Sequence, residues 1–328
     1  MPTRFARTLA IAVLAIAAGT IAKAQSIKGT ITLPSLPEGV AVNYLTNRIY
    51  VALPSFGGAT DSLAIVDGKS DTVVDTISIP PVAYDVAVDV LSDTIYVGGS
   101  YTDANGVQQS EIAVVNGVTK KVERTIPITS TLGSGIQGIA VNPLTGTVYV
   151  ANASDNVVDV IHRFGAKVHA QISVDESPFG VTVNPFNNQV YVALSNGTID
   201  VIDGHKETTT TTTVGGANTG IAANWVTGNV FVTNNNYGPS TVGVLDGKGD
   251  VLANVSVGET PYGVDVDLNT NLIFVANTMS GTLSVINGKT NTVAETLPVS
   301  GNFVAVNPTT SKVYITGQTN SVTVLNEQ

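Results

Sequence analysis

Seven copies of one sequence unit fill this chain, and the spacing inside each copy is fixed. Every copy has an aromatic residue eleven positions after its first residue. The copies begin at Gly39, Asp85, Gly138, Gly180, Gly220, Gly263 and Phe303, and the aromatics are Tyr50, Tyr96, Tyr149, Tyr191, Phe231, Phe274 and Tyr314. Successive copies start 46, 53, 42, 40, 43 and 40 residues apart, a period that indicates a propeller, a solenoid or an array.

Each copy contains four short runs of β-branched and aromatic residues, which we call strands a to d. In the third copy they cover residues 139–141, 147–151, 157–161 and 168–174. The turn between strands c and d holds Asp-Gly or Asn-Gly in five copies, and such pairs accept the positive φ angles of tight antiparallel hairpins. A four-stranded meander repeated radially is a propeller blade, so the sequence predicts an all-β, seven-bladed β-propeller.

The two ends of the chain are expected to share one blade. The seventh copy ends at Gln328 without a strand d, while a matching run occupies residues 27–33 near the other end. That run ends six residues before Gly39, as other d strands do before their copies. The N-terminal strand is therefore predicted to complete the last blade, which closes the ring three plus one and removes an exposed sheet edge. Residues 25–328 would then form a single propeller.

Residues 1–24 are typical of a secretory signal peptide. Arg4 and Arg7 precede an apolar stretch from Leu9 to Ala22, and Ala22-Lys23-Ala24 provides a cleavage pattern of small residues. A retained membrane anchor is the alternative, but the stretch is shorter than the roughly 20 residues of a bilayer span. No Cys follows it, which excludes a lipoprotein anchor. We expect a periplasmic or extracellular protein with no membrane insertion after signal cleavage.

Charge and cysteine content exclude several classes of function. Without the leader, the chain contains twelve Lys and Arg and 25 Asp and Glu, which gives a formal charge of −13. Such an acidic surface repels phosphate groups, so no nucleic acid partner is expected and anionic membranes are poor partners. The absence of Cys excludes disulfides, thiolate metal sites and a Cys nucleophile.

Several motifs in the copies are those of a known repeat family. The strings GVTVNP from Gly180, YVAN from Tyr149 and VINGK from Val285 resemble the YVTN β-propeller repeat family, and the resemblance covers the whole chain after residue 24. That family includes archaeal surface-layer proteins and exported bacterial proteins of unassigned role. The resemblance implies a propeller fold, and it implies no shared catalytic residues.

Length variation is concentrated on one face of the predicted propeller. In a meander, the a–b and c–d turns lie on one face, here called the bottom, and the b–c and d–a loops lie on the top. The distance from the aromatic to the end of strand c varies from 12 to 20 residues, whereas the a–b spacing is constant. Variable loops on a fixed scaffold commonly mark a binding face, although neutral drift is the alternative.

The basic residues avoid this top face. All twelve occur in a–b turns, c–d turns or d strands, while the top loops carry carboxylates such as Glu38, Asp61 and Asp103. A face without Lys or Arg disfavours phosphorylated, sulfated or carboxylate-rich ligands.

Aromatic, amide and carboxylate side chains are expected to gather on the top face. Aromatic rings beside such groups suit a peptide, a sugar face or a cationic group, although the aromatics could instead plug the channel mouth. The candidate ligand- or partner-binding residues are Phe56, Asp61, Tyr84, Asp85, Tyr101, Asp103, Asn105, Gln137, Phe179, Tyr237 and Tyr262.

Two carboxylates stand at unusual positions of the repeat. Asp85 replaces the Gly that begins five copies, and Asp265 occupies a position that is Ala in five copies. A buried carboxylate on an inner strand needs a partner, so a structural hydrogen bond is the favoured role for Asp265, with a metal or acid/base role open. The three His residues lie in c–d turns or a d strand, which argues against a His-rich metal site or a Ser-His-Asp triad.

These patterns support two hypotheses about function. The first is an exported, non-catalytic scaffold that binds a protein, peptide or glycan through its acidic, aromatic top face, with no cofactor. The second is a metal-assisted propeller hydrolase, lactonase or lyase with a divalent cation bound in the channel. Its candidate ligands are Asp85, Asp265, Asn152 and Asn277.

Overall fold

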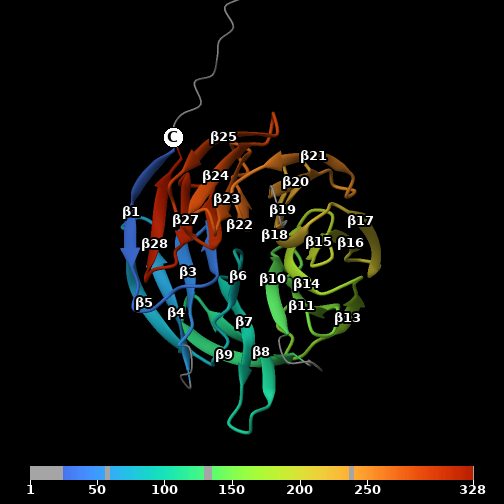
Figure 1. Ribbon diagram of the computed structural model, residues 1–328. Helices are drawn as coiled ribbons and strands as arrows, with labels where there is room; N and C mark the ends of the chain where they lie inside the picture. Colours follow the sequence, from blue (N-terminus) through green and yellow to red (C-terminus); the bar gives the residue numbers. More distant parts are fainter. Residues whose placement is uncertain (1–24, 56–59, 129–134, 236–239, 328) are drawn as a thin grey trace, which may run out of the picture.

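The computed structural model describes residues 25–55, 60–128, 135–235 and 240–327. These residues form 28 strands in seven four-stranded antiparallel sheets, and no helix occurs among them. The sheets are arranged around a central axis as the blades of a propeller (Figure 1), which confirms the predicted fold class. It follows that no helix in the described part of the chain could span a bilayer. Phe56 and Tyr237 lie outside the described residues.

Each of the first six blades is a continuous meander in chain order. Blade 1 contains β2 (Val40–Asn43), β3 (Arg48–Leu53), β4 (Asp61–Asp67) and β5 (Thr72–Ile79). Blade 2 contains β6 (Asp85–Asp89), β7 (Thr94–Thr102), β8 (Gln108–Asn116) and β9 (Lys121–Ile128). Blade 3 contains β10 (Ile136–Asn142), β11 (Thr147–Asn152), β12 (Val157–Ile161) and β13 (Ala170–Ser173).

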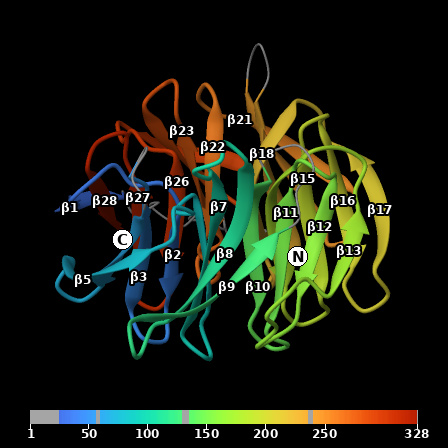
Figure 2. The ribbon, with the colours of Figure 1, turned by 90° about the horizontal axis from the view of Figure 1, so that it is seen from below.

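The second half of the chain repeats this order. Blade 4 contains β14 (Pro178–Asn184), β15 (Gln189–Leu194), β16 (Thr198–Asp203) and β17 (Thr208–Thr213). Blade 5 contains β18 (Ala217–Asn224), β19 (Asn229–Asn235), β20 (Thr241–Leu245) and β21 (Val251–Ser256). Blade 6 contains β22 (Pro261–Val266), β23 (Leu272–Asn277), β24 (Thr282–Asn287) and β25 (Thr292–Leu297). Figure 2 shows the ring edge-on, with the turns gathered at the two ends of the strands.

Blade 7 combines strands from the two ends of the chain. It contains β26 (Phe303–Asn307), β27 (Lys312–Thr316), β28 (Ser321–Asn326) and β1 (Ser26–Thr32). Strand β1 pairs antiparallel with β28, with Thr30 opposite Thr323 and a bulge between Ile27 and Gly29. The two strands lie side by side next to the C-terminus in Figure 1. The N-terminal strand begins and ends one residue earlier than the predicted range of 27–33.

The hydrophobic core lies between adjacent blades. One cluster joins Tyr50, Leu63 and Ile65 of blade 1 to Val86 and Val97 of blade 2. The central strands b and c are covered by a blade on each side, which explains their nearly continuous apolar sequences. The aromatic of each repeat belongs to this layer, and in every blade except blade 2 it is at most 1% exposed.

Hydrogen bonds between blades on the bottom face explain the fixed a–b spacing. The side-chain amide of Asn43, at the end of β2, donates to Asp93 Oδ1 of the next blade at 2.6 Å, and the Tyr50 hydroxyl donates to the same oxygen at 2.8 Å. Asn142 and Tyr149 of blade 3 bond Asn188 of blade 4 in the same way, at 2.7 and 3.1 Å. Adding a residue to an a–b turn would break this register between neighbouring blades.

The left-handed residue of the c–d turns is not the Gly of the Asp-Gly or Asn-Gly pair, and in blade 5 it is Gly249, with φ of 94°. In the other four turns the left-handed residues are Asp71, Lys120, Glu207 and Asn291, with φ between 52° and 57°. Gly68 is needed for close packing instead, because a Cβ at this position would lie 2.2 Å from Oδ1 of Asn47. The a–b turn of the same blade therefore fills the space that a side chain would need.

Two predicted boundaries also need correction. The b–c segment of blade 2, expected as a top-face loop, is between Gly98 and Glu111 mostly an extension of β7 and β8, in which Tyr101 lies opposite Gln109. This hairpin projects from the ring at the lower edge of Figure 1. Strand β13 is shorter than the predicted range of 168–174, because the segment before Ala170 pairs only at its end, through His169 N–H and the Val160 carbonyl at 2.8 Å.

Candidate functional site

A groove on the top face lies between blades 1 and 2. It has a volume of about 470 Å³ and is bounded by the segment after β3, the segment before β6 and the extended end of β7. Its lining includes three of the candidate residues: Asp61, Tyr84 and Tyr101. Glu38, which precedes β2, also lines the groove. Segments of blades 1 and 2 therefore meet in one sector of the top face.

The Glu38 carboxyl group lacks a positive counter-charge in this groove. No Lys or Arg occurs among the lining residues. The side chain is half-buried, and loss of solvent raises the pKa of Glu38 above its ordinary value. A cationic group that entered the groove would restore the interactions that the carboxylate loses on leaving water.

Asp61, one of the binding candidates, makes structural hydrogen bonds in the groove wall. The residue is 6% exposed, and both carboxylate oxygens accept backbone hydrogen bonds. Ser55 N–H donates to Oδ1 at 2.8 Å, and Ala83 N–H donates to Oδ2 at 2.9 Å. Asp61 therefore ties together the two segments that form the groove wall, and its charge is already compensated.

Tyr84 and Tyr262 close the top of the central channel. Their hydroxyl oxygens are 2.6 Å apart, although the two residues belong to blades 2 and 6. The ring of Phe303 from blade 7 packs edge-on against both, with centroid distances of 6.1 Å to Tyr84 and 5.3 Å to Tyr262. Burial raises the pKa of both hydroxyl groups. For these two residues, the alternative of an aromatic plug describes the structure.

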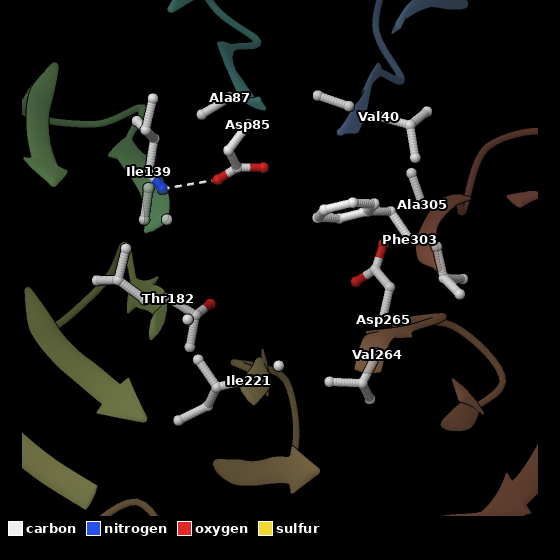
Figure 3. A pocket seen from close by; sticks show the side chains of 18 of the residues that line it. Val40, Asp85, Ala87, Ile139, Thr182, Ile221, Val264, Asp265, Phe303 and Ala305 are labelled. Atoms are coloured by element: carbon white, nitrogen blue, oxygen red, sulfur yellow. Dashed lines mark hydrogen bonds between the residues drawn. The ribbon is translucent and has the colours of Figure 1, made fainter. Parts of the chain in front are cut away.

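The central channel contains two carboxylates and no basic residue among its lining residues. It has a volume of about 350 Å³ and is lined by the inner strands of the blades, with Gln137 and Phe179 among its residues. Asp85 and Asp265 face each other across it, with the Phe303 ring between them (Figure 3). Burial raises the pKa of Asp85 to about 6 and that of Asp265 to about 7.

Both channel carboxylates bind the backbone of the next blade. Asp85 Oδ2 accepts a hydrogen bond from Ile139 N–H at 2.8 Å (Figure 3), and Asp265 Oδ2 accepts one from Val306 N–H at 2.7 Å. Asp265 Oδ1 also accepts from Val266 N–H at 2.8 Å. Asp265 thus has the partners that a buried carboxylate was expected to need.

The neighbouring blades explain why Asp85 is unusual. A Cβ at Gly138 would lie 2.5 Å from the carbonyl oxygen of Phe179, so the backbone of the next blade occupies that space. A Cβ at Gly180 would lie 2.6 Å from the Thr219 carbonyl for the same reason. In blade 2 the side chain of Asp85 itself makes the contact with the next blade. The sequence repeat shows that Asp85 departs from the usual Gly, but the reason for this departure lies in the contact with the adjacent blade.

The four residues of the predicted metal site are not brought together. Asn152 Nδ2 donates to Asp159 Oδ2 in its own blade at 3.0 Å, and Asn277 Nδ2 donates to Ser284 Oγ at 2.9 Å. Neither Asn lines the channel. Within the described ranges, no group of three or more His, Asp or Glu side chains is placed to hold a metal ion.

The remaining candidates lie on the tip of the β7–β8 hairpin. Asp103 accepts backbone hydrogen bonds from Val107 and Asn105, both at 2.9 Å, and a side-chain bond from Gln109 at 3.2 Å. These bonds, with that from Val107 the strongest, hold the pKa of Asp103 below its ordinary value. Asp103 forms the turn, and neither it nor Asn105 lines the groove.

Comparison with known proteins bears on the fold alone. No protein-family model matches the chain, and no curated protein matches it. Among solved structures, hydrazine synthase of Kuenenia stuttgartiensis superimposes with a TM-score of 0.74 at 16% sequence identity, over 89% of this chain and 95% of that chain. The two share a β-propeller fold. The resemblance to the YVTN repeat family rests on the repeat motifs, without support from a family model.

Proposed function

We propose that this protein is an exported, non-catalytic propeller that binds a protein or peptide partner in the top groove between blades 1 and 2. A basic side chain of the partner enters the groove beside Glu38. The family resemblance of the repeats and the leader-like residues 1–24 favour export to the periplasm or cell exterior.

The observation that carries this proposal is the uncompensated carboxylate in the groove. Glu38 is half-buried, no Lys or Arg lines the groove, and the Tyr84 and Tyr101 side chains form parts of the same wall. An ammonium or guanidinium group would gain an ion pair with Glu38 and a favourable contact with aromatic faces. A neutral glycan would leave the carboxylate without a counter-charge, so the geometry favours a basic peptide.

The channel carboxylates favour a scaffold over an enzyme. Asp85 and Asp265 have raised pKa values, as catalytic groups often do, but each is bonded to a backbone amide of the next blade. The Tyr84–Tyr262 pair separates them from the top groove. The hydrogen bonds that Asp85 and Asp265 make to the neighbouring blades are sufficient to explain why both carboxylates are buried in the channel.

A peptide-binding experiment tests the proposal. Fluorescence anisotropy would compare a labelled Lys-Gly repeat peptide with a matched Glu-Gly peptide. We expect binding of the lysine peptide only, weakened at least about tenfold in Glu38→Gln and by high salt. Glu259→Gln, at an exposed top-face position, is the matched control. Equal binding by Glu38→Gln, or a preference for the acidic peptide, would contradict the proposal; binding of neutral oligosaccharides alone would assign the groove to glycans.

A further inference from the structure

The bottom face presents large apolar side chains at one repeated position. Five consecutive blades each expose one at the second residue after the Asn or Asp that ends strand a. The side chains, which we call the apolar crescent, are Leu45, Leu91, Leu144, Phe186 and Val226, and they are 58, 58, 56, 72 and 68% exposed. Single exposed apolar residues are ordinary on a protein surface, but a contiguous group marks an interaction site.

The crescent surrounds the lower end of the channel. Tyr44, Val90 and Trp225, each directly before a crescent residue, line the channel. The turns of neighbouring blades also contact each other, because Thr309 Oγ1 donates to the Tyr44 carbonyl at 3.1 Å and Asn269 Nδ2 donates to the Pro308 carbonyl at 2.7 Å. The crescent residues therefore occupy consecutive places in one ring of turns.

Folding of the turn does not require an apolar residue at this position. Blades 6 and 7 have Asn269 and Thr309 there, and the turn is the same. The c–d turns of blades 2 and 3 add Val118 and Phe164 to the same face, at 76 and 75% exposed. On the top face, the exposed large apolar residues of the described chain are Val107 and Met279. Exposed large apolar side chains are thus enriched on the bottom face, in the sector formed by blades 1 to 5.

We propose that the apolar crescent docks a second copy of this chain, bottom face to bottom face. A two-fold axis between the copies would place crescent against crescent, since a dimer of this symmetry uses the same patch on both partners. The exposed apolar surface, on the order of several hundred Å² per copy, reaches the size of the apolar centre of a stable interface.

The distribution of charge favours a second copy over other occupants. The bottom turns mix exposed Lys69, Lys206 and Lys248 with exposed Glu207 and Asp250, so two such faces can complement each other. The top face carries carboxylates without Lys or Arg in its loops and would repel a copy of itself. Without residues 1–24 the formal charge of −13 also repels anionic lipid.

Face-to-face pairing would direct the two top grooves away from each other. This inference goes beyond the proposed function, and neither depends on the other. If both hold, the dimer presents two binding grooves on opposite sides and gains avidity toward a repetitive partner.

Sedimentation velocity of residues 25–328, which supply all seven blades, tests the dimer. We expect a mass that rises from monomer to dimer over about 1 to 200 µM protein. Raising the salt from about 0.05 to 0.5 M should strengthen the dimer, because it screens the repulsion of two acidic chains. The double variant Leu144→Glu/Phe186→Glu should weaken it by at least about 30-fold, with an unchanged thermal melt. Met279→Glu, 73% exposed on the opposite face, is the matched control and should remain dimeric.

Three outcomes would overturn the inference. One is a wild-type chain that stays monomeric across this range at both salt concentrations. Another is a dimer that the double variant retains, which would place the interface elsewhere. The third is crescent-dependent co-sedimentation of a monomer with phosphatidylcholine vesicles, with or without phosphatidylglycerol, which would assign the crescent to a lipid surface.

Discussion

The two faces of the propeller differ in where neighbouring blades are joined by side chains. On the bottom face, Asn43, Asn142, Asn224 and Asn307 each donate to the a–b turn of the next blade, at 2.6 to 2.8 Å. The top face has extended or lengthened segments between strands b and c, such as the β7–β8 hairpin. Where a turn must meet its neighbour its length is fixed, and where it meets solvent or a ligand it can vary.

The bottom joints themselves show two solutions. In blades 1, 2, 4 and 6 the left-handed residue of the a–b turn is Asn or Asp, and its side chain accepts the bond from the preceding blade. The other three blades have Gly146, Gly228 and Ser311 there. In blade 3 the side chain of Arg163 occupies the space beside Gly146 and pairs with Asp89 of blade 2 at 2.9 Å.

The joint between blades 6 and 7 is the acidic counterpart of that pair. Asp267 stands where blade 2 has Asp89, and Glu327 stands where blade 3 has Arg163, within two residues of the end of strand c. Thr270 Oγ1 donates to Glu327 Oε1 at 2.6 Å, and the buried Glu327 carboxyl group also forms a side-chain hydrogen bond with Asp267. Burial and the neighbouring Asp267 carboxylate raise the pKa of Glu327 to about 8. A base is thus replaced by a second acid that retains its proton.

Removing β1 should have the largest effect. Deletion of residues 25–34 takes away the strand that pairs with β28 and exposes its edge, so we expect aggregation or loss of the cooperative melt. The chain that begins at residue 25 is the reference in calorimetry and light scattering. A truncated chain that melts within about two degrees of the reference would show that the pairing adds little stability.

The Asp89–Arg163 pair provides the next test of the bottom joints. Arg163→Met should lower the free energy of unfolding by about 3 kcal/mol, because it leaves the buried Asp89 carboxylate without its cation. Lys206→Met is the control, since Lys206 forms an exposed pair with Asp203 and its loss should cost below about 0.5 kcal/mol. Chemical denaturation measures the free energy of unfolding of both variants. An equal loss in the two variants would contradict the expectation that the buried pair contributes more than the exposed one.

Asp61 is a top-face residue whose side chain should nevertheless contribute to stability, as the inter-blade side chains of the bottom face do. Asp61→Ala should cost about 2 kcal/mol, because it leaves the Ser55 and Ala83 amides without their acceptor. Asp103→Ala, at the exposed hairpin tip, should cost below about 1 kcal/mol. If Asp61→Ala were as mild as Asp103→Ala, the groove wall would not depend on that carboxylate.

The last prediction concerns the pH dependence of stability at the acidic joint. Glu327 holds its proton in the folded state up to about pH 8, whereas the unfolded chain releases it near its ordinary pKa, so this group lowers stability as pH rises through that interval. Glu327→Gln should therefore flatten the loss of stability between about pH 5 and 8 and be more stable than wild type at about pH 9. Glu259→Gln, exposed on the top face, should follow the wild-type profile. Parallel profiles for wild type and Glu327→Gln in urea denaturation would exclude a protonated Glu327.

The sequence alone determined the number of blades, the strands of each blade and the N-terminal strand as a partner for the last. These features depend on local signals that repeat: alternating runs, turn residues and the constant eleven-residue spacing. Loop length and chain order also sufficed to place Tyr84 and Tyr101 on the top face, but not to show that both line one groove. The exposed apolar position in five successive a–b turns was equally readable, but its meaning depended on knowing that the turns form one ring.

Only the tertiary structure decided which of these side chains remain available. Tyr84 meets a partner 178 residues away, and Asp85 one 54 residues away in another blade. Asp61 is occupied by backbone amides of two separate segments, whereas Glu38 has no counter-charge in the groove. No local pattern encodes such pairings, because each depends on how one sheet stacks against the next. The fold followed from interactions within a repeat, and the site followed from contacts between repeats.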